Sequence, residues 1–316
     1  MQSISRRAFV ISAATAGAAF GLDRPLEFVG RAFAQANSGP EVVKFKVGDI
    51  EVIQMYDGVW EKAHDPGFVK NASLDDVKAS LKAAGLTDAH VPVTFTVTAV
   101  RIGGRLVLFD SGTGAQLAPT AGNITKNGLW QAAGIDPAKV DTIVMTHFHG
   151  DHISGLMAKD TNAPVFPNAT IHVPADEYKF WTTPTVTAGA AKRIQAVFPG
   201  WKSIRQFEGE AEVVPGVKAV NTYGHTPGHM SYLVSAGGQQ VMVLGDVTNI
   251  RALNMRNPGW HLAFDGDANL AETNRRKVFD RVVADKIVAT GYHWGMPGAG
   301  TVEKDGSGYA LVPVKA

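Results

Sequence analysis

The sequence predicts an α+β fold in which two sets of β-strands form a sandwich and helices follow each set. Short β-branched and apolar runs recur about glycine turns, as in Thr94–Ile102 and Arg105–Phe109, which flank Gly103-Gly104 and indicate a hairpin. A loose rhythm of strands followed by a helix occurs twice along the chain. Several strands end directly at His or Asp residues, and such ends converge only where strands lie side by side, as at the edge of a sandwich.

The other elements follow from the same kinds of pattern. Ser73 begins Ser-Leu-Asp-Asp, which resembles a capping box and predicts a helix that ends at Gly85. Residues 182–202 have no regular pattern, and we expect them to form a flap or a pocket wall. Strands are predicted over 42–47, 50–55, 141–145, 170–173, 217–221, 231–234, 241–244 and 286–289, and helices over 74–84, 129–133, 268–284 and from about Pro174.

Composition limits the class of protein. The 316 residues, 45% of them hydrophobic, are enough to bury a large core. The formal net charge is +1, and residues 1–34 hold a net of +2, which leaves −1 for the rest and no basic surface for nucleic acid. The chain has no cysteine, so disulfides, thiolate ligands and cysteine nucleophiles are excluded. After residue 34 no apolar run reaches the ~20 residues that span a bilayer.

The first 34 residues resemble a twin-arginine export signal. Arg6-Arg7 lies before a weakly apolar stretch, and Ala32-Phe33-Ala34 provides a cleavage site of small residues, in the order that such signals have. A short N-terminal helix with two stray arginines is the alternative. We therefore expect a signal peptide over 1–34, one folded domain over 35–316 and a location in a bacterial periplasm.

A cluster of metal-binding side chains lies in residues 146–152, Thr-His-Phe-His-Gly-Asp-His, directly after a predicted buried strand. Side chains at i and i+2 of an extended segment point the same way, so His147 and His149 are predicted to share one metal ion. Asp151 and His152, past Gly150, are predicted to face a second ion. The alternative is a histidine-rich surface loop without a metal. Nitrogen and oxygen ligands suit Zn²⁺ and are compatible with Mn²⁺, Co²⁺ or Fe²⁺.

Three later strand ends supply the remaining predicted ligands. The full set is His147, His149 and His225 for one ion, Asp151, His152 and His293 for the other, and Asp246 as a bridge between them. Two cations that share these ligands leave room for one hydroxide, which they make acidic enough to exist near neutral pH. That hydroxide is the predicted nucleophile, and Asp151 and Asp246 are the predicted catalytic residues that act with it.

Other side chains are predicted to support this site. Asp110, at the end of a strand, is expected to accept a hydrogen bond from a ligand imidazole and fix its orientation, although an aspartate before Ser-Gly also suits a plain turn. His229 is expected to support the site without touching a metal. The aromatic residues Phe148, Trp181 and Trp294 are candidates for the wall of an apolar pocket, with core packing as the alternative for each.

The motifs together resemble the metallo-β-lactamase superfamily. They are Asp-x-Gly at 110–112, His-x-His-x-Asp-His at 147–152, Gly-His-Thr-x-Gly-His at 224–229, Leu-Gly-Asp at 244–246 and Gly-x-His at 291–293. The resemblance spans Val42 to the C-terminus. It implies a four-layer αββα sandwich with a two-metal site at one edge and a hydrolase domain over 35–316. Within the superfamily the chain is most similar to the methyl parathion hydrolase and lactonase-like branch.

The resemblance also implies a function: a hydrolase with two Zn²⁺ ions that acts on a small ester-like substrate, with lactones and organophosphate triesters favoured. Superfamily members that hydrolyse β-lactams generally lack an aspartate where Asp246 stands, and diiron redox relatives usually carry Glu where His149 stands. A β-lactam or thioester hydrolase, an iron-dependent oxidoreductase and a periplasmic metal-binding protein without turnover are the alternatives. Relatives are often dimers, so a homodimer is one assembly that the resemblance implies.

Overall fold

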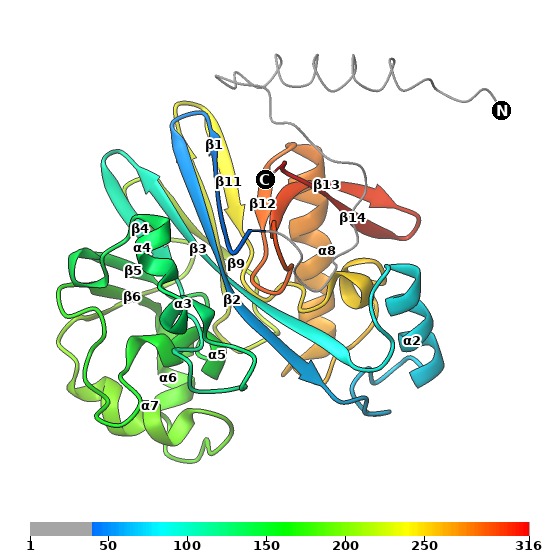
Figure 1. Ribbon diagram of the computed structural model, residues 1–316, viewed down its shortest axis with the longest axis horizontal. Coiled ribbons are helices and arrows are strands. Elements are labelled where there is room, and N and C mark those ends of the chain that lie inside the picture. The colour runs from blue at the N-terminus through cyan, green and yellow to red at the C-terminus, as the bar shows by residue number, and fades with distance from the viewer. Residues whose placement is uncertain (1–39, 316) are drawn as a thin grey trace.

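The computed structural model describes residues 40–315 of the chain. The predicted signal peptide, residues 1–34, and its cleavage site lie outside the described residues. Figure 1 shows two sheets packed face to face, with helices on the outside of the pair. Within residues 40–315 no helix is long and apolar enough to cross a membrane.

Two seven-stranded mixed sheets form the centre of the fold, and in each the strands lie side by side in chain order. The strands from β4 to β7 are parallel, as are β11 and β12, and the other neighbours are antiparallel. The first sheet contains β1 (Val42–Val47), β2 (Ile50–Lys62), β3 (Val91–Ile102), β4 (Arg105–Phe109), β5 (Thr142–Val144), β6 (Thr170–Pro174) and β7 (Ile204–Phe207). The second contains β8 (Glu212–Val214), β9 (Val217–Asn221), β10 (Met230–Ala236), β11 (Gln239–Val243), β12 (Val288–Thr290), β13 (Ala299–Asp305) and β14 (Gly308–Pro313).

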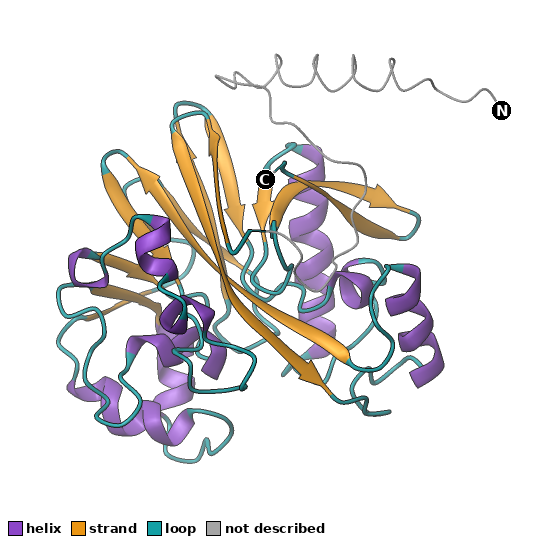
Figure 2. Ribbon diagram, in the orientation of Figure 1, coloured by secondary structure: helices purple, strands orange, loops and turns teal. Residues whose placement is uncertain are grey.

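Helices cover the outer faces of the two sheets, as the colouring in Figure 2 shows. They are α2 (Leu74–Ala83), α3 (Asn123–Lys126), α4 (Leu129–Ala133), α5 (Gly150–Ile153), α6 (Ala175–Thr182), α7 (Ala191–Val197) and α8 (Ala268–Ala284). Short 3₁₀ turns occur at η1 (Pro137–Lys139), η2 (Ser154–Leu156) and η3 (Phe198–Gly200), and a π-helical turn occurs at η4 (Arg251–Met255). The layers confirm the predicted α+β class and the four-layer αββα sandwich.

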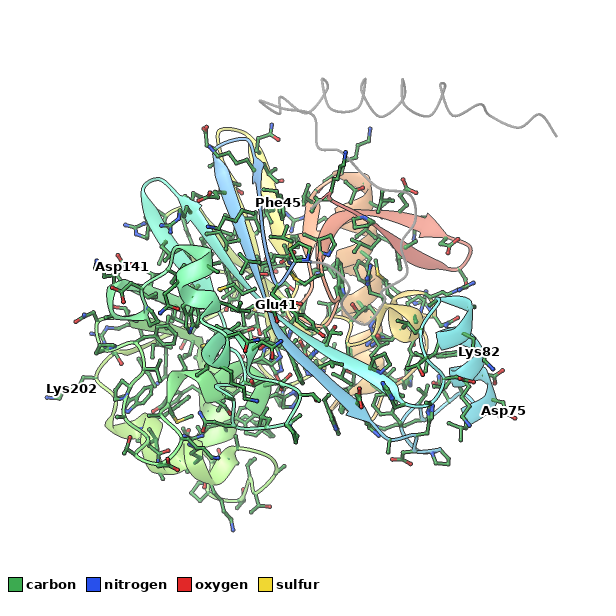
Figure 3. The ribbon with its side chains drawn as sticks, in the orientation of Figure 1. Glu41, Phe45, Asp75, Lys82, Asp141 and Lys202 are labelled. Atoms are coloured by element: carbon green, nitrogen blue, oxygen red, sulfur yellow. The ribbon has the colours of Figure 1, made fainter. Side chains whose placement is uncertain are left out.

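Three apolar cores hold these layers together. Between the sheets, Val100 and Phe109 pack with Tyr232 and Val241, and the rings of Phe109 and Tyr232 have centroids 5.6 Å apart. A second core joins the first sheet to its helices, and a third joins the second sheet to α8. Burial of this apolar surface is the main force that keeps the sheets face to face. Exposed charged residues lie at the periphery, as Figure 3 illustrates.

Several elements begin and end where local sequence signals place them. Ser73 Oγ accepts a hydrogen bond from the Asp76 backbone N–H, and the Asp76 carboxylate accepts one from the Ser73 N–H, so the predicted capping box starts α2. Strand β2 runs to Lys62, well past the predicted end at Met55. The register shift between Tyr56 and Gly58 explains this difference, because a bulge lets the strand continue through residues that resemble a turn.

The prediction for residues 182–202 is wrong. The segment contains α7 and the 3₁₀ turn η3, and α7 packs against α6 rather than forming a flap. None of its residues lines the cavity at the predicted metal ligands. Ala191 and Ile194, three residues apart on one face of α7, are fully buried. The flanking Pro184, Pro199 and glycines concealed a helix of only 7 residues.

Candidate metal centre

The side chains predicted as metal ligands converge at one edge of the sandwich. Four of them come from residues 146–152, which follow β5 and include the first turn of α5; we call this segment the histidine loop. The other three come from the second sheet: His225 follows β9, Asp246 follows β11 and His293 follows β12. Because these strand ends lie at the same edge, residues up to 146 positions apart in the chain form two groups, His147, His149, His225 and Asp246 in one and Asp151, His152 and His293 in the other.

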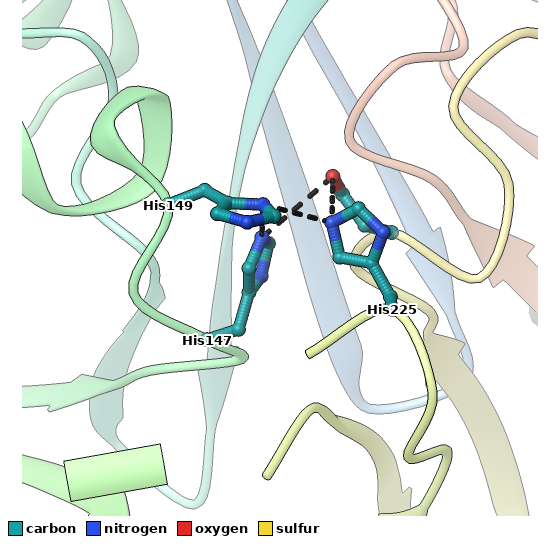
Figure 4. Close-up of side chains that lie close together, drawn as sticks. His147, His149 and His225 are labelled. Atoms are coloured by element: carbon teal, nitrogen blue, oxygen red, sulfur yellow. Dashed lines mark hydrogen bonds and ion pairs between the residues drawn. The ribbon is translucent and has the colours of Figure 1, made fainter. Parts of the chain in front are cut away.

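In the first group three imidazole nitrogens and a carboxylate oxygen face one point. His149 Nδ1 lies 3.0 Å from His147 Nε2 and 2.9 Å from His225 Nε2. Asp246 Oδ2 lies 3.2 Å from His225 Nε2 and 3.7 Å from His147 Nε2. Figure 4 shows His147 and His149 on the histidine loop facing His225 across the junction of the two sheets.

The second group adjoins the first through Asp246. Asp246 Oδ2 lies 3.0 Å from His293 Nε2, and Asp246 Oδ1 lies 3.2 Å from His152 Nε2. Asp151 Oδ2 lies 3.4 Å from His152 Nε2 and 3.5 Å from His293 Nε2. Asp246 therefore contacts histidines of both groups, which is the position predicted for a bridging carboxylate.

In three of the imidazoles, those of His147, His152 and His293, the outer nitrogen is held by a hydrogen bond, which fixes the ring orientation. The hydroxyl of Thr146 donates to Asp110 Oδ2 (2.7 Å), so its oxygen is free to accept from His147 Nδ1 (3.0 Å). His152 Nδ1 donates to Asp110 Oδ2 at 2.7 Å. His293 Nδ1 donates to the backbone carbonyl of Thr94 at 2.7 Å. These contacts leave the Nε2 atoms of the three rings directed at the cluster.

His225 has a support that the sequence analysis missed. Its Nδ1 donates to Asp265 Oδ1 at 3.0 Å, and Asp265 Oδ2 accepts from Arg275 Nη2 at 2.9 Å. Arg275 is buried and also donates to the backbone carbonyls of Val247 and Pro258. Asp265 lies 40 residues from His225. A lone Asp-Gly pair in a loop gives no sign of such a partner, so nothing in the sequence indicated it.

Asp110 and His229 lie where the sequence analysis expected supporting residues. Asp110, with φ of 59° directly after β4, accepts hydrogen bonds from the backbone N–H and hydroxyl of Thr146 as well as from His152. His229 Nε2 accepts the backbone N–H of Asp246 at 3.0 Å, so its proton is on Nδ1, which donates to the carbonyl of Thr222 at 3.2 Å. Both residues thus hold parts of the cluster in place.

The electrostatics of the cluster keep His149 uncharged at neutral pH, and two of its buried polar atoms lack a hydrogen-bond partner within residues 40–315. Burial lowers the pKa of His149, with a further contribution from His225, to about 3. Burial also lowers the pKa of His152, but the carboxylates of Asp246, Asp151 and Asp110 outweigh it and raise the value well above normal. The buried atoms His152 Nε2 and Asp246 Oδ1 have no hydrogen-bond partner among the described residues. Such atoms are costly unless they bind a cation.

The donor set fits two divalent cations. A tetrahedral Zn²⁺ with bonds of ~2.0–2.1 Å places neighbouring ligand atoms about 3.3 Å apart. The separations given above, from 2.9 to 3.7 Å, bracket that value, and all ligand atoms of a group lie within 4.8 Å of one another. Nitrogen and carboxylate oxygen are ligands that zinc accepts, and Mn²⁺, Co²⁺ and Fe²⁺ also accept them.

The family model of the metallo-beta-lactamase superfamily matches residues 95–291, which include every residue of both groups except His293. The chain belongs to the metallo-β-lactamase superfamily. The predicted family is therefore confirmed, together with the fold that it implies.

Within this superfamily the chain is similar to lactonases and to other hydrolases. An N-acyl homoserine lactonase from Bacillus sp is 28% identical over 149 residues, 47% of this chain and 54% of the relative. The N-acyl homoserine lactonase AttM of Agrobacterium fabrum is 34% identical over 121 residues, 36% of this chain and 43% of the relative. The matches thus span about half the length of these relatives.

Two solved structures share the fold over most of its length. The hydrolase AbOPH of the β-lactamase superfamily has a TM-score of 0.78 at 25% identity, with 89% of this chain and 99% of that one covered. AidC, described as a dizinc quorum-quenching lactonase, has a TM-score of 0.78 at 22% identity, with 87% and 98% covered. The second likeness shows the fold alone.

A cavity of about 710 Å³ opens over the metal-binding groups of this metallo-β-lactamase-fold protein. His149, Asp151, His225, Asp246 and His293 lie in its lining. The other lining residues are mostly apolar: Trp60, Val93, Phe95, Leu117, Ala118, Pro119, Ala263 and Phe264, with Gly150 and the polar Asn249. Its size is that of a pocket for a small organic ligand.

The structure corrects the predicted pocket wall, because Phe148, Trp181 and Trp294 do not line this cavity. Phe148 packs edge-on against Phe198, with centroids 5.3 Å apart. Trp181 Nε1 donates to a carboxylate of its own helix, and its ring meets the edge of His149. Trp294 stacks on Phe279 of α8 in the outer core. All three are buried packing residues.

Proposed function

We propose that this protein is a hydrolase that binds two metal ions, zinc in the first instance, and cleaves uncharged ester-type substrates, lactones above all. The observation that carries the proposal is the position of the metal-binding groups, which line a cavity whose remaining wall is mostly apolar. The lactonase names of the relatives from Bacillus sp and Agrobacterium fabrum support the lactone class.

The chemistry of the cavity supports an uncharged substrate. No lysine or arginine occurs among its lining residues in the described part of the chain, so apart from the proposed metal ions no positive charge there would bind an anionic phosphate, sulfate or carboxylate. Trp60 and Leu117, 40% and 49% exposed, present apolar surface at this cavity. Phe264 packs near Trp60, with ring centroids 6.3 Å apart. A lactone or a phosphotriester with an apolar substituent suits such a wall.

The residues of the chain divide the work of the reaction. Two divalent cations, once bound, would polarise the substrate oxygen and lower the pKa of a coordinated water. Burial raises the pKa of Asp151, but His152 and His293 outweigh it and bring the value to about 2. A carboxylate with this pKa stays ionised at neutral pH, which is the form that a metal ligand needs. The apolar wall limits competing water around the substrate.

The first experiment measures initial rates on a lactone, a phosphotriester, a thioester and a β-lactam, before and after removal of metal by a chelator. The proposal expects chelator-sensitive turnover, fastest for the lactone, that returns when zinc is added. Chelator-insensitive turnover, or none of the four substrates being cleaved, would contradict it. Fastest turnover of the phosphotriester would keep the mechanism and change the substrate class.

Two exposed leucines allow a matched test of the cavity wall. Leu117 lines the cavity, whereas Leu270 on α8 is similarly exposed, at 40%, and does not. Leu117→Ala should raise KM for a lactone with an apolar chain about three- to tenfold, because it removes apolar contact area. Leu270→Ala should leave KM unchanged. Equal KM values for the two variants would show that the substrate does not lie against this wall.

A further inference from the structure

The carboxylate of Glu177 on helix α6 is buried behind the metal-binding groups and outside the cavity lining. It accepts four hydrogen bonds. Oε1 accepts from the backbone N–H of Phe148 (2.9 Å) and from Trp181 Nε1 (2.6 Å). Oε2 accepts from the hydroxyl of Thr226 (2.7 Å) and from the backbone N–H of Gly228 (3.0 Å).

Three of these donors belong to the two loops that carry metal-binding histidines. Phe148 lies in the histidine loop of the first sheet, between His147 and His149. Thr226 and Gly228 lie in the loop after β9 of the second sheet, directly after His225. One carboxylate therefore joins the loops that supply all three histidines of the first metal-binding group, one oxygen to each loop.

The fit between α6 and the second loop is tight. A Cβ on Gly228 would lie 2.2 Å from the backbone nitrogen of Glu177 and 2.7 Å from its Cα, which no side chain can tolerate. Glycine at 228 lets the loop approach the helix closely enough for its N–H to reach Oε2. The close approach explains why the Gly-His-Thr-Pro-Gly-His run needs its second glycine.

The four donors also indicate which form of Glu177 the fold requires. Burial raises the pKa of Glu177, and its hydrogen bonds from Thr226, Phe148, Trp181 and Gly228 oppose that effect. Only the carboxylate can accept all four hydrogen bonds, because a protonated oxygen would direct its own hydrogen at a donor. A glutamine would direct the hydrogens of its NH₂ group at the donors of one loop, so the hydrogen bonds to that loop would be lost.

We propose that Glu177 is a positioning residue that holds the histidine loop and the loop after β9 at the separation at which His147, His149 and His225 bind one metal ion. The inference rests on the proposed two-metal site. The residue touches neither substrate nor metal and acts through the backbone of the two loops.

The first test compares zinc binding by the purified wild-type chain and by Glu177→Gln, using competition with a chromophoric chelator. The substitution keeps the size of the side chain and reverses the hydrogen-bonding sense of one oxygen. We expect zinc affinity to fall about 10- to 100-fold, the range seen when groups that orient metal ligands are lost. The visible absorption of the cobalt-substituted protein should also change, because the geometry around the ion changes.

A milder pair of variants tests the same link if Glu177→Gln fails to fold. Thr226→Val keeps the shape of the side chain but loses the hydroxyl that donates to Oε2, and Thr226→Ser keeps the hydroxyl. We expect Thr226→Val to bind zinc more weakly than the wild type and Thr226→Ser to keep most of the wild-type zinc affinity. A purely structural role would lower the denaturant midpoint of the metal-free protein without changing its zinc affinity or the cobalt spectrum.

The outcomes separate this inference from the proposed function. If the wild-type protein binds two zinc ions and cleaves a lactone while Glu177→Gln and Thr226→Val bind zinc as tightly, only the positioning role is overturned. If the wild-type protein binds no zinc, the proposed function is overturned, and the positioning role with it. Weakened zinc binding in both variants, with recovery in Thr226→Ser, supports the role.

Discussion

The two sheets contribute to the metal centre in different ways. The first sheet supplies His147, His149, Asp151 and His152 from one loop of consecutive residues. The second supplies one residue from each of three strand ends, so its contribution exists only when β9, β11 and β12 lie side by side. The first contribution is local in the sequence and the second depends on the whole fold.

The groups that orient the histidines differ in the same way. In the first sheet Thr146 is adjacent to His147, and Asp110 lies at the end of the neighbouring strand β4. In the second sheet His225 depends on Asp265 and, through it, on Arg275 of α8, and His293 depends on the carbonyl of Thr94, 199 residues away in the other sheet. A site of this kind can be identified from one compact motif, although half of it is built by distant contacts.

The largest expected effect comes from the residue that connects the two groups. Asp246→Ala should lose hydrolysis down to the background rate and bind fewer zinc ions, because Asp246 contacts His225, His152 and His293. Elemental analysis and initial rates measure both results. The control is His90→Ala, which replaces a histidine outside the metal-binding groups and should keep the wild-type hydrolysis rate and zinc content. A fully active Asp246→Ala would contradict the bridging role.

A comparison of the two supporting carboxylates tests how far each sheet depends on distant contacts. Asp265→Asn should weaken zinc binding about 10- to 100-fold. It should also lower the free energy of unfolding of the metal-free protein by about 3–5 kcal/mol, because Arg275 is left as a buried charge without its partner. Asp110→Asn should weaken zinc binding similarly but lower the free energy of unfolding by only about 1–3 kcal/mol. Thr146 is a neutral donor, and His152 keeps the carboxylates of Asp151 and Asp246 beside it.

Urea denaturation of the two metal-free variants measures that difference. Equal losses of stability would show that the buried pair of Asp265 and Arg275 does not set the second sheet apart from the first. A variant of either kind that binds zinc as the wild type does would show that its carboxylate does not orient a ligand.

The smallest expected effect concerns the attachment of α8 to the second sheet. Hydrogen bonds from Lys304 Nζ and Tyr309 Oη lower the pKa of Asp280 below its usual value. A lowered pKa in the folded state stabilises the protein above the unfolded-state pKa, and this stabilisation is lost as the pH falls through the folded-state value. Asp280→Asn should therefore lower the free energy of unfolding by about 0.2–1 kcal/mol at neutral pH. The effect is small because solvent screens the ion pair of Asp280 and Lys304.

Thermal or urea unfolding across pH 2–7 checks this expectation. The stability curves of the wild type and Asp280→Asn should converge at the acidic end, where both side chains are uncharged. A difference that stays constant with pH would show that packing, and not the charge of Asp280, is what the substitution removes.

The sequence predicted the family, the layered fold and a set of side chains that the structure brings together. These features leave local signals: alternating apolar residues in strands, a capping box at Ser73 and histidines directly after a strand. The hydrogen-bond acceptors that orient His225 and His293 leave no local signal in the sequence. Asp265 and the carbonyl of Thr94 are brought to these histidines only by tertiary contacts.

The pocket wall was predicted wrongly for a reason that is also physical. Phe148 lies between His147 and His149, so the alternation of an extended segment directs it to the opposite face, where it packs against Phe198. Trp294 follows His293 and is likewise directed away from the cavity into the core with α8. The residues that do line the cavity, such as Trp60 and Phe264, come from segments without a metal motif.

The central claim is that two sheets together hold two metal ions at one edge of the sandwich. The most direct test is zinc titration of the metal-free chain, with the bound metal measured by elemental analysis. Two zinc ions per chain, falling to one or none when His225 is replaced by alanine, are predicted. A wild-type chain that binds no zinc, or binds it equally well without His225, would contradict the account.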